Sequence, residues 1–226
     1  VKMMILANPH NPCGIAWDAA TLQGIAEIMR RNGVLVISDE IHGEMVLDGT
    51  QHIPFAAVSE DATANSIVFM APSKTFNIAG IVSSYCIIED DALRERFFRY
   101  IASCEIDFPS IFSVVATKAA YTKGEQWRRE MLDYVRGNID FVDSWLRTNV
   151  KGIRAVRPHA SFLIWLDCRK LGLSHDELND LFVNKAQLAL NDGAMFGAEG
   201  SGFMRLNVGC PRSVLKSALE SLKKAL

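Results

Sequence analysis

The sequence predicts an α/β protein in which a mostly parallel sheet is sandwiched by helices and followed by a smaller C-terminal α+β domain. Three observations predict this fold class. Apolar runs of strand length alternate with helical periodicity up to residue 123, residues 125–148 form one long amphipathic segment, and closely spaced strand-like runs follow. Hydrophobic residues make up 49% of the 226 residues and charged residues 22%, a composition that can bury a full core.

The first predicted unit is a strand, a helix and a second strand. Residues 3–7 are an apolar run that ends at a turn rich in Asn and Pro. Residues 17–31 carry apolar side chains at helical spacing, and the Asn-Gly pair at 32–33 favours a helix end. Residues 34–37 are continuously apolar, which is typical of a parallel strand covered on both faces.

The same alternation continues along the chain. Residues 66–70 and 83–88 have the apolar strand pattern, and residues 90–103 and 110–123 have the helical one. Residues 125–148 predict a longer helix, because their apolar side chains fall on roughly one side.

After this helix the sequence predicts a second domain. Strand-like runs cover residues 153–157, 161–167 and 202–208, and helical segments cover residues 174–185 and 212–226. We therefore expect a large domain at residues 1–124, a connecting helix at 125–148 and a small domain at 149–226.

Composition narrows the class of protein. The net charge of −2 gives no electrostatic reason to expect nucleic acid or an anionic membrane as a partner. We expect no membrane span, because no apolar run is long enough. The five cysteines are scattered and lack a C-x-x-C pair, so we expect neither a disulfide framework nor a metal site, and a cytoplasmic location fits best.

Two side chains at strand ends suggest a cofactor site. Asp39 follows the strand at 34–37, and Lys74 follows the strand at 67–70. In open α/β sheets, ligands collect outside the carboxyl ends of strands. A lysine can bind an aldehyde covalently and a carboxylate can keep a pyridine nitrogen protonated, so the two describe the protein side of a pyridoxal 5'-phosphate (PLP) site. Taken alone, each is also typical of a solvated turn.

Four further residues are candidates. Ser73 could offer its hydroxyl to a phosphate, and the Asn11 amide could reach a phenolic oxygen, although both also suit polar turns. His42 lies three residues after Asp39, and a lone His is more often structural. Arg205 lies between apolar residues, where a cation needs an anionic partner such as a substrate carboxylate.

Six motifs in order carry a resemblance to a known family. They are NPHNPCG at residues 8–14, SDEIH at 38–42, HIPFA at 52–56, SKTFNIAG at 73–80, PHASFLIWLDCR at 158–169 and FMRLNVGCPR at 203–212. The chain resembles the fold-type I PLP enzymes of the class I/II aminotransferase superfamily, and within them the MalY/PatB group of cystathionine β-lyases (carbon–sulfur lyases). The resemblance covers the whole chain.

The resemblance implies roles for the candidate residues. Lys74 would bind the cofactor covalently and act as the base at the substrate Cα. Asp39 would pair with the pyridine nitrogen, while Asn11 and His42 would lie at the cofactor's phenolic oxygen.

Ser73 would help to hold the phosphate by the same resemblance, and Arg205 and Asn11 would bind the amino-acid substrate, Arg205 at its α-carboxylate. The large domain would be the PLP-binding domain, and the full-length enzyme would be a homodimer.

The sequence departs from the family in two places. Many aminotransferases carry a phosphate-binding arginine eight residues after the lysine, and this position is Val82 here. The family also has a long N-terminal segment that these residues lack, so the resemblance implies a C-terminal portion of a longer enzyme, with little activity alone.

We therefore expect β-elimination from cystathionine or cysteine to pyruvate, ammonia and a thiol. An aminotransferase with the same site residues is the alternative. A non-catalytic regulator, or an inactive fragment, is a third.

Overall fold

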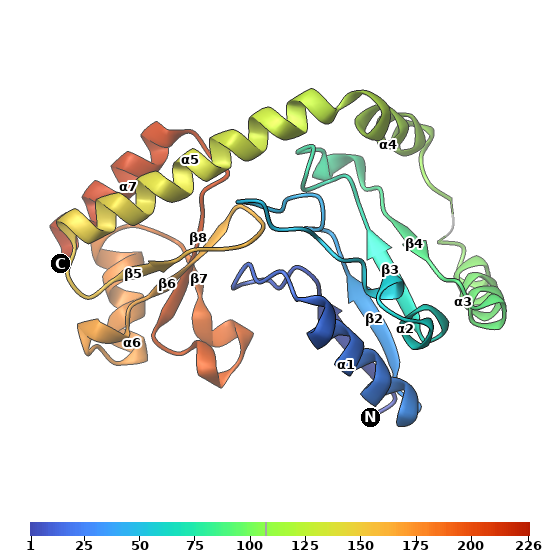
Figure 1. The fold of residues 1–226 in the computed structure, drawn as a ribbon. Helices are drawn as coiled ribbons and strands as arrows, with labels where there is room; N and C mark the ends of the chain where they lie inside the picture. Colours follow the sequence, from blue (N-terminus) through green and yellow to red (C-terminus); the bar gives the residue numbers. More distant parts are fainter. Residues whose placement is uncertain (107) are drawn as a thin grey trace. The chain divides into compact units, whose positions relative to one another are not determined.

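The computed structural model describes residues 1–106 and 108–226. Contacts divide the chain into two compact units. The first comprises Val1–His10 and Ile15–Glu130, and the second comprises Asn11–Gly14 and Met131–Leu226. Figure 1 shows the order of the elements along the chain.

The first unit is built on a four-stranded sheet in the order β1-β2-β3-β4. Its strands are β1 (Met3–Ala7), β2 (Leu35–Asp39), β3 (Ser66–Met70) and β4 (Tyr85–Ile87). The first three run parallel, and β4 pairs antiparallel with β3. The predicted α/β class with a mostly parallel sheet is confirmed, with one antiparallel edge strand that apolar patterning could not orient.

Among the residues that the structure describes, four α-helices lie wholly within this unit. They are α1 (Ala19–Arg31), α2 (Glu60–Ala64), α3 (Asp91–Ser103) and α4 (Ile111–Lys123). Helix α1 begins where the Asp18 carboxylate accepts a hydrogen bond from the Thr21 amide at 2.8 Å. It ends before Gly33, whose φ of 62° suits a glycine.

The core of the first unit lies between the sheet and helices α1 and α2. Its buried members are Leu6, Leu22, Ala26, Val36, Phe55 and Ala62. Helix α3 contacts the opposite face through Phe97, whose ring centroid lies 6.1 Å from that of Phe69 on β3. Phe69 pairs in register with Asp39, so Asp39 points away from the α1–α2 core.

Helix α5 (Glu125–Asn149) begins in the first unit and continues into the second. Its buried side chains recur at helical spacing from Leu132 to Leu146. The fully buried Asn138 interrupts this apolar stripe, and its amide nitrogen donates to the carbonyls of Val208 at 2.8 Å and Cys210 at 2.9 Å. These bonds satisfy the amide and tie α5 to the chain that leads into the last helix.

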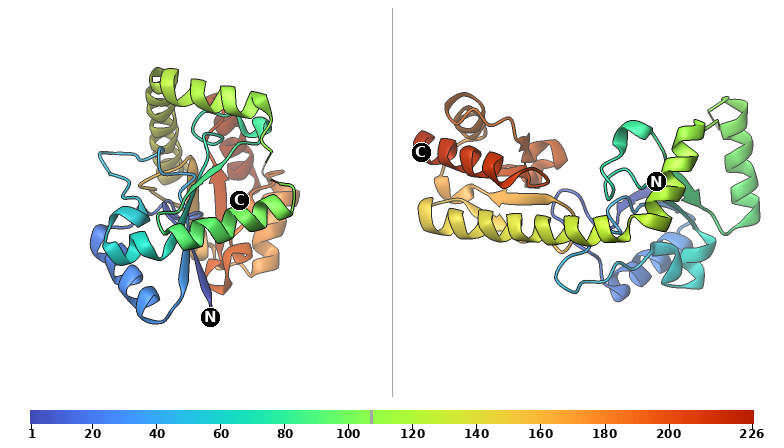
Figure 2. Two further views of the ribbon diagram at one scale, coloured as in Figure 1. Left: turned by 90° about the vertical axis from the view of Figure 1, so that its right-hand side faces the viewer. Right: turned by 90° about the horizontal axis from the view of Figure 1, so that it is seen from above.

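The second unit has its own antiparallel sheet in the order β5-β6-β8-β7. Its strands are β5 (Arg154–Val156), β6 (Leu163–Asp167), β7 (Asn191–Asp192) and β8 (Phe203–Asn207), and its helices are α6 (His175–Asn179) and α7 (Arg212–Ala225). Helix α7 runs beside α5 in Figures 1 and 2, with Lys223 donating to the Asn149 side chain at 2.8 Å.

The short segment Asn11–Gly14 belongs to the second unit although it lies early in the chain. The Gly14 carbonyl accepts hydrogen bonds from the amides of His159 at 2.8 Å and Ala160 at 3.1 Å. A Cβ at Gly14 would overlap that of Pro158, so only glycine allows this close approach. The expected division at residues 124 and 149 stays a prediction.

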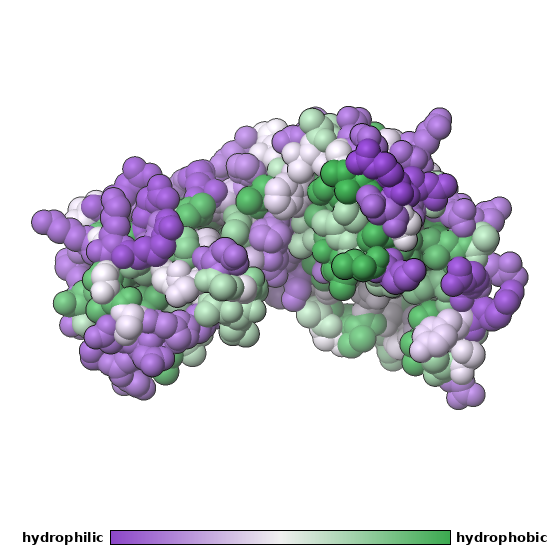
Figure 3. Space-filling model, turned by 90° about the horizontal axis from the view of Figure 1, so that it is seen from below, coloured by the Kyte–Doolittle hydropathy of each residue, from purple (hydrophilic) through white to green (hydrophobic). Residues whose placement is uncertain are grey.

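Green, apolar areas lie on the face of the molecule that Figure 3 shows. The exposed apolar residues of the first unit include Ile5 on β1 and Phe112 and Val115 on α4. Apolar side chains gathered at a surface are typical of areas that another protein surface covers. Across residues 1–106 and 108–226, no helix combines the length and apolar character needed to cross a membrane.

Candidate active site

Asp39 and Lys74 lie at the same edge of the first sheet. Asp39 is the last residue of β2, and Lys74 lies in the turn that follows the neighbouring parallel strand β3. Both side chains are exposed. Because the carboxyl ends of parallel strands meet at one edge, an accessible amine and an accessible carboxylate share this edge.

The backbone fixes Asp39 from both sides. Its carbonyl oxygen accepts from the Asn8 amide at 2.9 Å, and the next amide, that of Glu40, donates to the Phe69 carbonyl at 2.9 Å. The Asp39 Oδ1 atom accepts from the Ile41 amide at 3.2 Å, which leaves its second carboxylate oxygen for another donor.

The turn that carries Ser73 and Lys74 is closed by backbone hydrogen bonds. The Phe76 amide donates to the Pro72 carbonyl at 2.9 Å, and the Ile78 amide donates to the Ser73 carbonyl at 3.0 Å. Ser73 is half-buried beside the exposed Lys74. Helix α5 also contacts this turn, since the Trp127 indole donates to the Thr75 carbonyl at 3.3 Å.

Val82 stands where many aminotransferases carry a phosphate-binding arginine. Its side chain is 82% exposed and its φ is 53°, an uncommon backbone conformation for a β-branched residue. The Ser113 hydroxyl donates to the preceding Ile81 carbonyl at 2.8 Å and holds this turn. An apolar side chain offers a phosphate no charge, so Val82 cannot replace the arginine.

The turn after β2 carries His42, which is buried at 5% exposure. Its carbonyl accepts from the Met45 amide at 3.0 Å. Glu44, in the same turn, is half-buried, and burial raises the pKa of its carboxyl group. The Glu44 carbonyl accepts from Arg128 at 3.2 Å, which ties this turn to the start of α5.

Glu40 is a feature to which the sequence analysis assigned no role. Its side chain is fully buried, and its carboxylate accepts from the Ser38 hydroxyl at 2.8 Å, the Phe55 amide at 2.8 Å and His52 Nε2 at 2.7 Å. The motifs SDEIH and HIPFA are therefore joined in space. The presence of both motifs in one chain was the only sequence signal for this contact.

Arg205 and Asn11 meet in the second unit. Arg205 lies on β8, and its Nη1 donates to the Asn11 Oδ1 atom at 2.7 Å, while Nη2 donates to the Asn191 Oδ1 atom at 2.7 Å. Its Cζ lies 4.9 Å from the centroid of the Phe196 ring, at a cation–π distance. Burial lowers the pKa of Arg205.

The guanidinium of Arg205 keeps spare hydrogen-bonding capacity. No residue in the described ranges accepts a hydrogen bond from its buried Nε, and none of their carboxylates forms an ion pair with it. A half-buried cation that is held by neutral amides suits an anionic ligand. Lys74, Asp39, His42 and Ser73 belong to the first unit, whereas Asn11 and Arg205 belong to the second.

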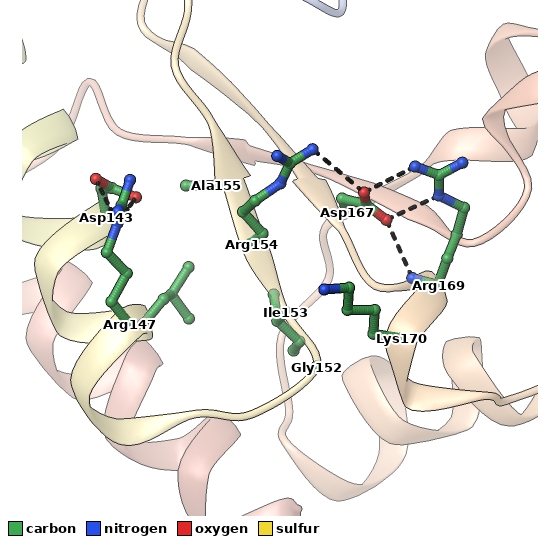
Figure 4. A pocket seen from close by; sticks show the side chains of 10 residues that line it. Asp143, Arg147, Gly152, Ile153, Arg154, Ala155, Asp167, Arg169 and Lys170 are labelled. Carbon is green, nitrogen blue, oxygen red and sulfur yellow. Dashed lines mark hydrogen bonds and ion pairs between the residues drawn. The ribbon is translucent and has the colours of Figure 1, made fainter.

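A pocket of the second unit does not involve these residues. Its lining includes Asp143, Arg147, Arg154, Asp167 and Arg169 (Figure 4). Arg147 Nε donates to both Asp143 oxygens at 3.0 Å, and Arg169 donates to both Asp167 oxygens at 2.9 and 2.8 Å. These cations are already paired with carboxylates, so the pocket is not a site for the predicted chemistry.

Comparison with known proteins identifies the family. A family model described as aminotransferase class I and II matches residues 1–222. The chain belongs to this family. Over 226 residues it is 40% identical to cystathionine beta-lyase PatB of Bacillus subtilis and 32% identical to protein MalY of Escherichia coli. It spans 58% and 57% of the length of these two relatives.

Members of this aminotransferase family with solved structures have the same fold. A PLP-bound putative aminotransferase from Clostridium difficile matches 100% of the chain with a TM-score of 0.96 and 41% identity, over 58% of its own length. A PLP-bound C-S lyase from Staphylococcus hominis matches 100% of the chain with a TM-score of 0.90 and 33% identity, over 57% of its length. Both structures hold the cofactor that the sequence predicted.

Proposed function

We propose that this protein is a PLP-dependent carbon–sulfur β-lyase that converts cystathionine or cysteine to pyruvate, ammonia and a thiol. One observation carries the proposal. An accessible lysine and an accessible carboxylate, Lys74 and Asp39, follow neighbouring parallel strands at one edge of the sheet. Relatives named cystathionine beta-lyase and C-S lyase support the reaction type.

The residues at the sheet edge fit PLP by their chemistry. When bound, PLP supplies an electron sink for the electron pair that a substrate Cα leaves on losing its proton. Lys74 would hold the cofactor's aldehyde carbon covalently, and as a free amine it would take the proton from the substrate Cα. Asp39 holds a proton on the pyridine nitrogen through its unoccupied oxygen.

Three further residues complete the proposed site. Ser73 donates its hydroxyl to the phosphate, and His42 and Asn11 lie at the phenolic oxygen. With Val82 in place of the usual arginine, the phosphate depends on neutral donors such as Ser73. We expect these donors to bind the cofactor's phosphate group more weakly than an arginine would.

Arg205 binds the substrate's α-carboxylate. Asn11 and Asn191 orient the guanidinium plane, and Phe196 lies against its face. The remaining N–H groups can form two parallel bonds to a carboxylate. Lys74 would take the proton from Cα, and the electron pair left at Cα would form the Cα=Cβ bond as the Cβ–S pair leaves with sulfur as a thiolate. Water would then hydrolyse the aminoacrylate product to ammonia and pyruvate.

An aminotransferase is the second candidate, since a solved relative at 41% identity carries that name. Product analysis of the full-length protein separates the two. Cystathionine that yields pyruvate and a thiol without a keto acid indicates a lyase, and strict dependence on a keto-acid acceptor indicates a transferase. Lys74→Ala abolishes either activity, whereas the matched control Lys216→Ala, an exposed lysine on α7, retains it.

We also infer that the full-length protein is a cytoplasmic homodimer. The exposed Ile111, Phe112 and Val115 of α4 support association with a second copy, and five unpaired cysteines support a reducing compartment. Light scattering of the purified full-length protein tests the dimer. A monomer at micromolar concentration would contradict it.

A further inference from the structure

Residues 52–55 connect the carboxyl ends of β1 and β2. The Asn8 side chain donates to the Ile53 carbonyl at 2.9 Å, just after β1. The Phe55 amide and His52 bond to the Glu40 carboxylate at 2.8 and 2.7 Å, just after β2. One short segment, which follows β2 in the sequence, therefore holds the carboxyl ends of both strands.

The Glu40 carboxylate is the centre of this connection. Its side chain has no exposed surface, so water cannot compensate its charge. Oε1 accepts from the Ser38 hydroxyl and the Phe55 amide, and Oε2 accepts from His52. Loss of one donor leaves part of a buried carboxylate unsatisfied, which is far more costly than the loss of an exposed bond.

Gly43 shows that the contact with His52 is closely fitted. A Cβ at this position would lie 2.7 Å from Cδ2 and 2.8 Å from Nε2 of the His52 ring. Carbon atoms do not approach this closely without displacement, so a glycine is needed for His52 to reach Glu40. His52 is itself 11% exposed, which shields the bond from solvent.

These contacts act on the residue between Ser38 and Glu40. The side chains of Ser38 and Glu40 bond to each other, so they share the face of the sheet that packs on α1 and α2. Asp39 points to the other face. A peptide anchored at Glu40 has little freedom to rotate, and this fixes the direction of the Asp39 side chain.

We propose that Glu40 is a positioning residue for Asp39, with His52 and the Phe55 amide as the groups that hold it. The proposal rests on the proposed PLP chemistry, because it assigns Asp39 to the pyridine nitrogen. A carboxylate that must meet a ring nitrogen gains from a fixed direction, since misplacement weakens a charge-assisted hydrogen bond.

A double-mutant cycle on cofactor affinity tests this proposal in the full-length protein. Apoprotein is titrated with PLP and the visible absorbance of the bound cofactor is recorded, so the readout is independent of turnover. The variants are Glu40→Gln, Asp39→Ala and the double variant. Glu60→Gln, an exposed carboxylate on α2, is the matched control and should leave the affinity unchanged.

Coupled residues give non-additive effects. We expect Glu40→Gln to weaken PLP affinity about 5-fold when Asp39 is present and less than about 2-fold when Asp39 is Ala. His52→Phe removes one hydrogen-bond donor to Glu40 but keeps an aromatic ring. It should weaken PLP affinity by a smaller factor than Glu40→Gln, and again only when Asp39 is present. This variant also serves if Glu40→Gln does not fold.

Equal losses in both backgrounds would overturn the proposal, because Glu40 would then act on the fold alone. Wild-type affinity in Glu40→Gln and His52→Phe would overturn it too. Wild-type protein that binds no PLP would refute the proposed function itself, and the positioning role with it. Additivity in a protein that does bind PLP would refute only the positioning role.

Discussion

Replacing Gly14 by alanine tests how the early segment is joined to the second unit. Gly14 has a φ of 68°, a conformation that costs an alanine about 1 kcal/mol. The new Cβ would overlap Pro158 and lie 2.9 Å from the Ala160 carbonyl oxygen. Overpacking of this kind costs about 1–3 kcal/mol. If the segment moved away to relieve the overlap, the hydrogen bonds that the Gly14 carbonyl accepts would break.

Gly172 is a matched control for this substitution. It belongs to the same unit, its φ is 69°, and a Cβ there would meet nothing within 4 Å. Gly172→Ala should lower the free energy of unfolding by only the backbone term of about 1 kcal/mol. We expect Gly14→Ala to lower it by about 3 kcal/mol.

Urea unfolding at 25 °C, followed by circular dichroism, measures both values. Gly14→Ala should also weaken substrate binding, because Asn11 in the same segment orients Arg205. If both variants were destabilised equally, Pro158 would have moved aside at no cost. The claim that only glycine allows the close approach at residue 14 would then be wrong.

Three further predictions concern charged residues. Lys74→Arg keeps the charge but cannot bind an aldehyde, so the full-length variant should lack the visible, borohydride-sensitive absorbance of the bound cofactor; its retention would refute the assignment. Arg205→Lys loses the planar two-point grip, and we expect KM for amino-acid substrates to rise by about 10-fold or more with an unchanged cofactor spectrum. Loss of PLP instead would make Arg205 a cofactor ligand. The hydrogen bonds from Arg169 lower the pKa of Asp167, so this pair stabilises the fold above the ordinary Asp value of about pH 4 and loses that effect as pH falls through the lower folded value. Asp167→Asn should therefore cost about 1 kcal/mol at pH 7, a small figure because Arg169 is exposed, and the difference from wild type should shrink below about pH 4. Thermal unfolding across pH 2–8 measures it, and a constant difference would contradict the sign.

Strands were predictable where a short apolar run lies between turn residues. Residues 3–7 and 66–70 were predicted with the bounds that β1 and β3 have. The predicted helix at 174–185 is instead α6 followed by a π-helical turn at Asp180–Lys185. Apolar spacing does not distinguish the two hydrogen-bonding patterns over so few residues. Helix α2, with five residues, was missed because it is too short to show a period.

The candidate site was predictable only in part, for a physical reason. Asp39 and Lys74 could be placed at strand ends because the elements around them are local in sequence. The burial of Glu40 could not be predicted, because two of its donors come from His52 and Phe55, more than ten residues away in the chain. The bond between Asn11 and Arg205 spans 194 residues and leaves no local pattern.

The way each charge is held supports the proposed division of roles. Glu40 is fully buried and both its carboxylate oxygens accept hydrogen bonds from the protein, so no ligand reaches it and it can act only on its neighbours. Arg205 has five N–H donors and spends two on Asn11 and Asn191, which are neutral and leave its charge uncompensated. Asp39 is exposed and uses one oxygen on a backbone amide. A charge whose hydrogen bonds are complete stabilises a structure, whereas a fixed charge with donors or acceptors to spare is ready to bind. By this criterion we propose that Asp39 binds the cofactor, that Arg205 binds the substrate and that Glu40 positions Asp39.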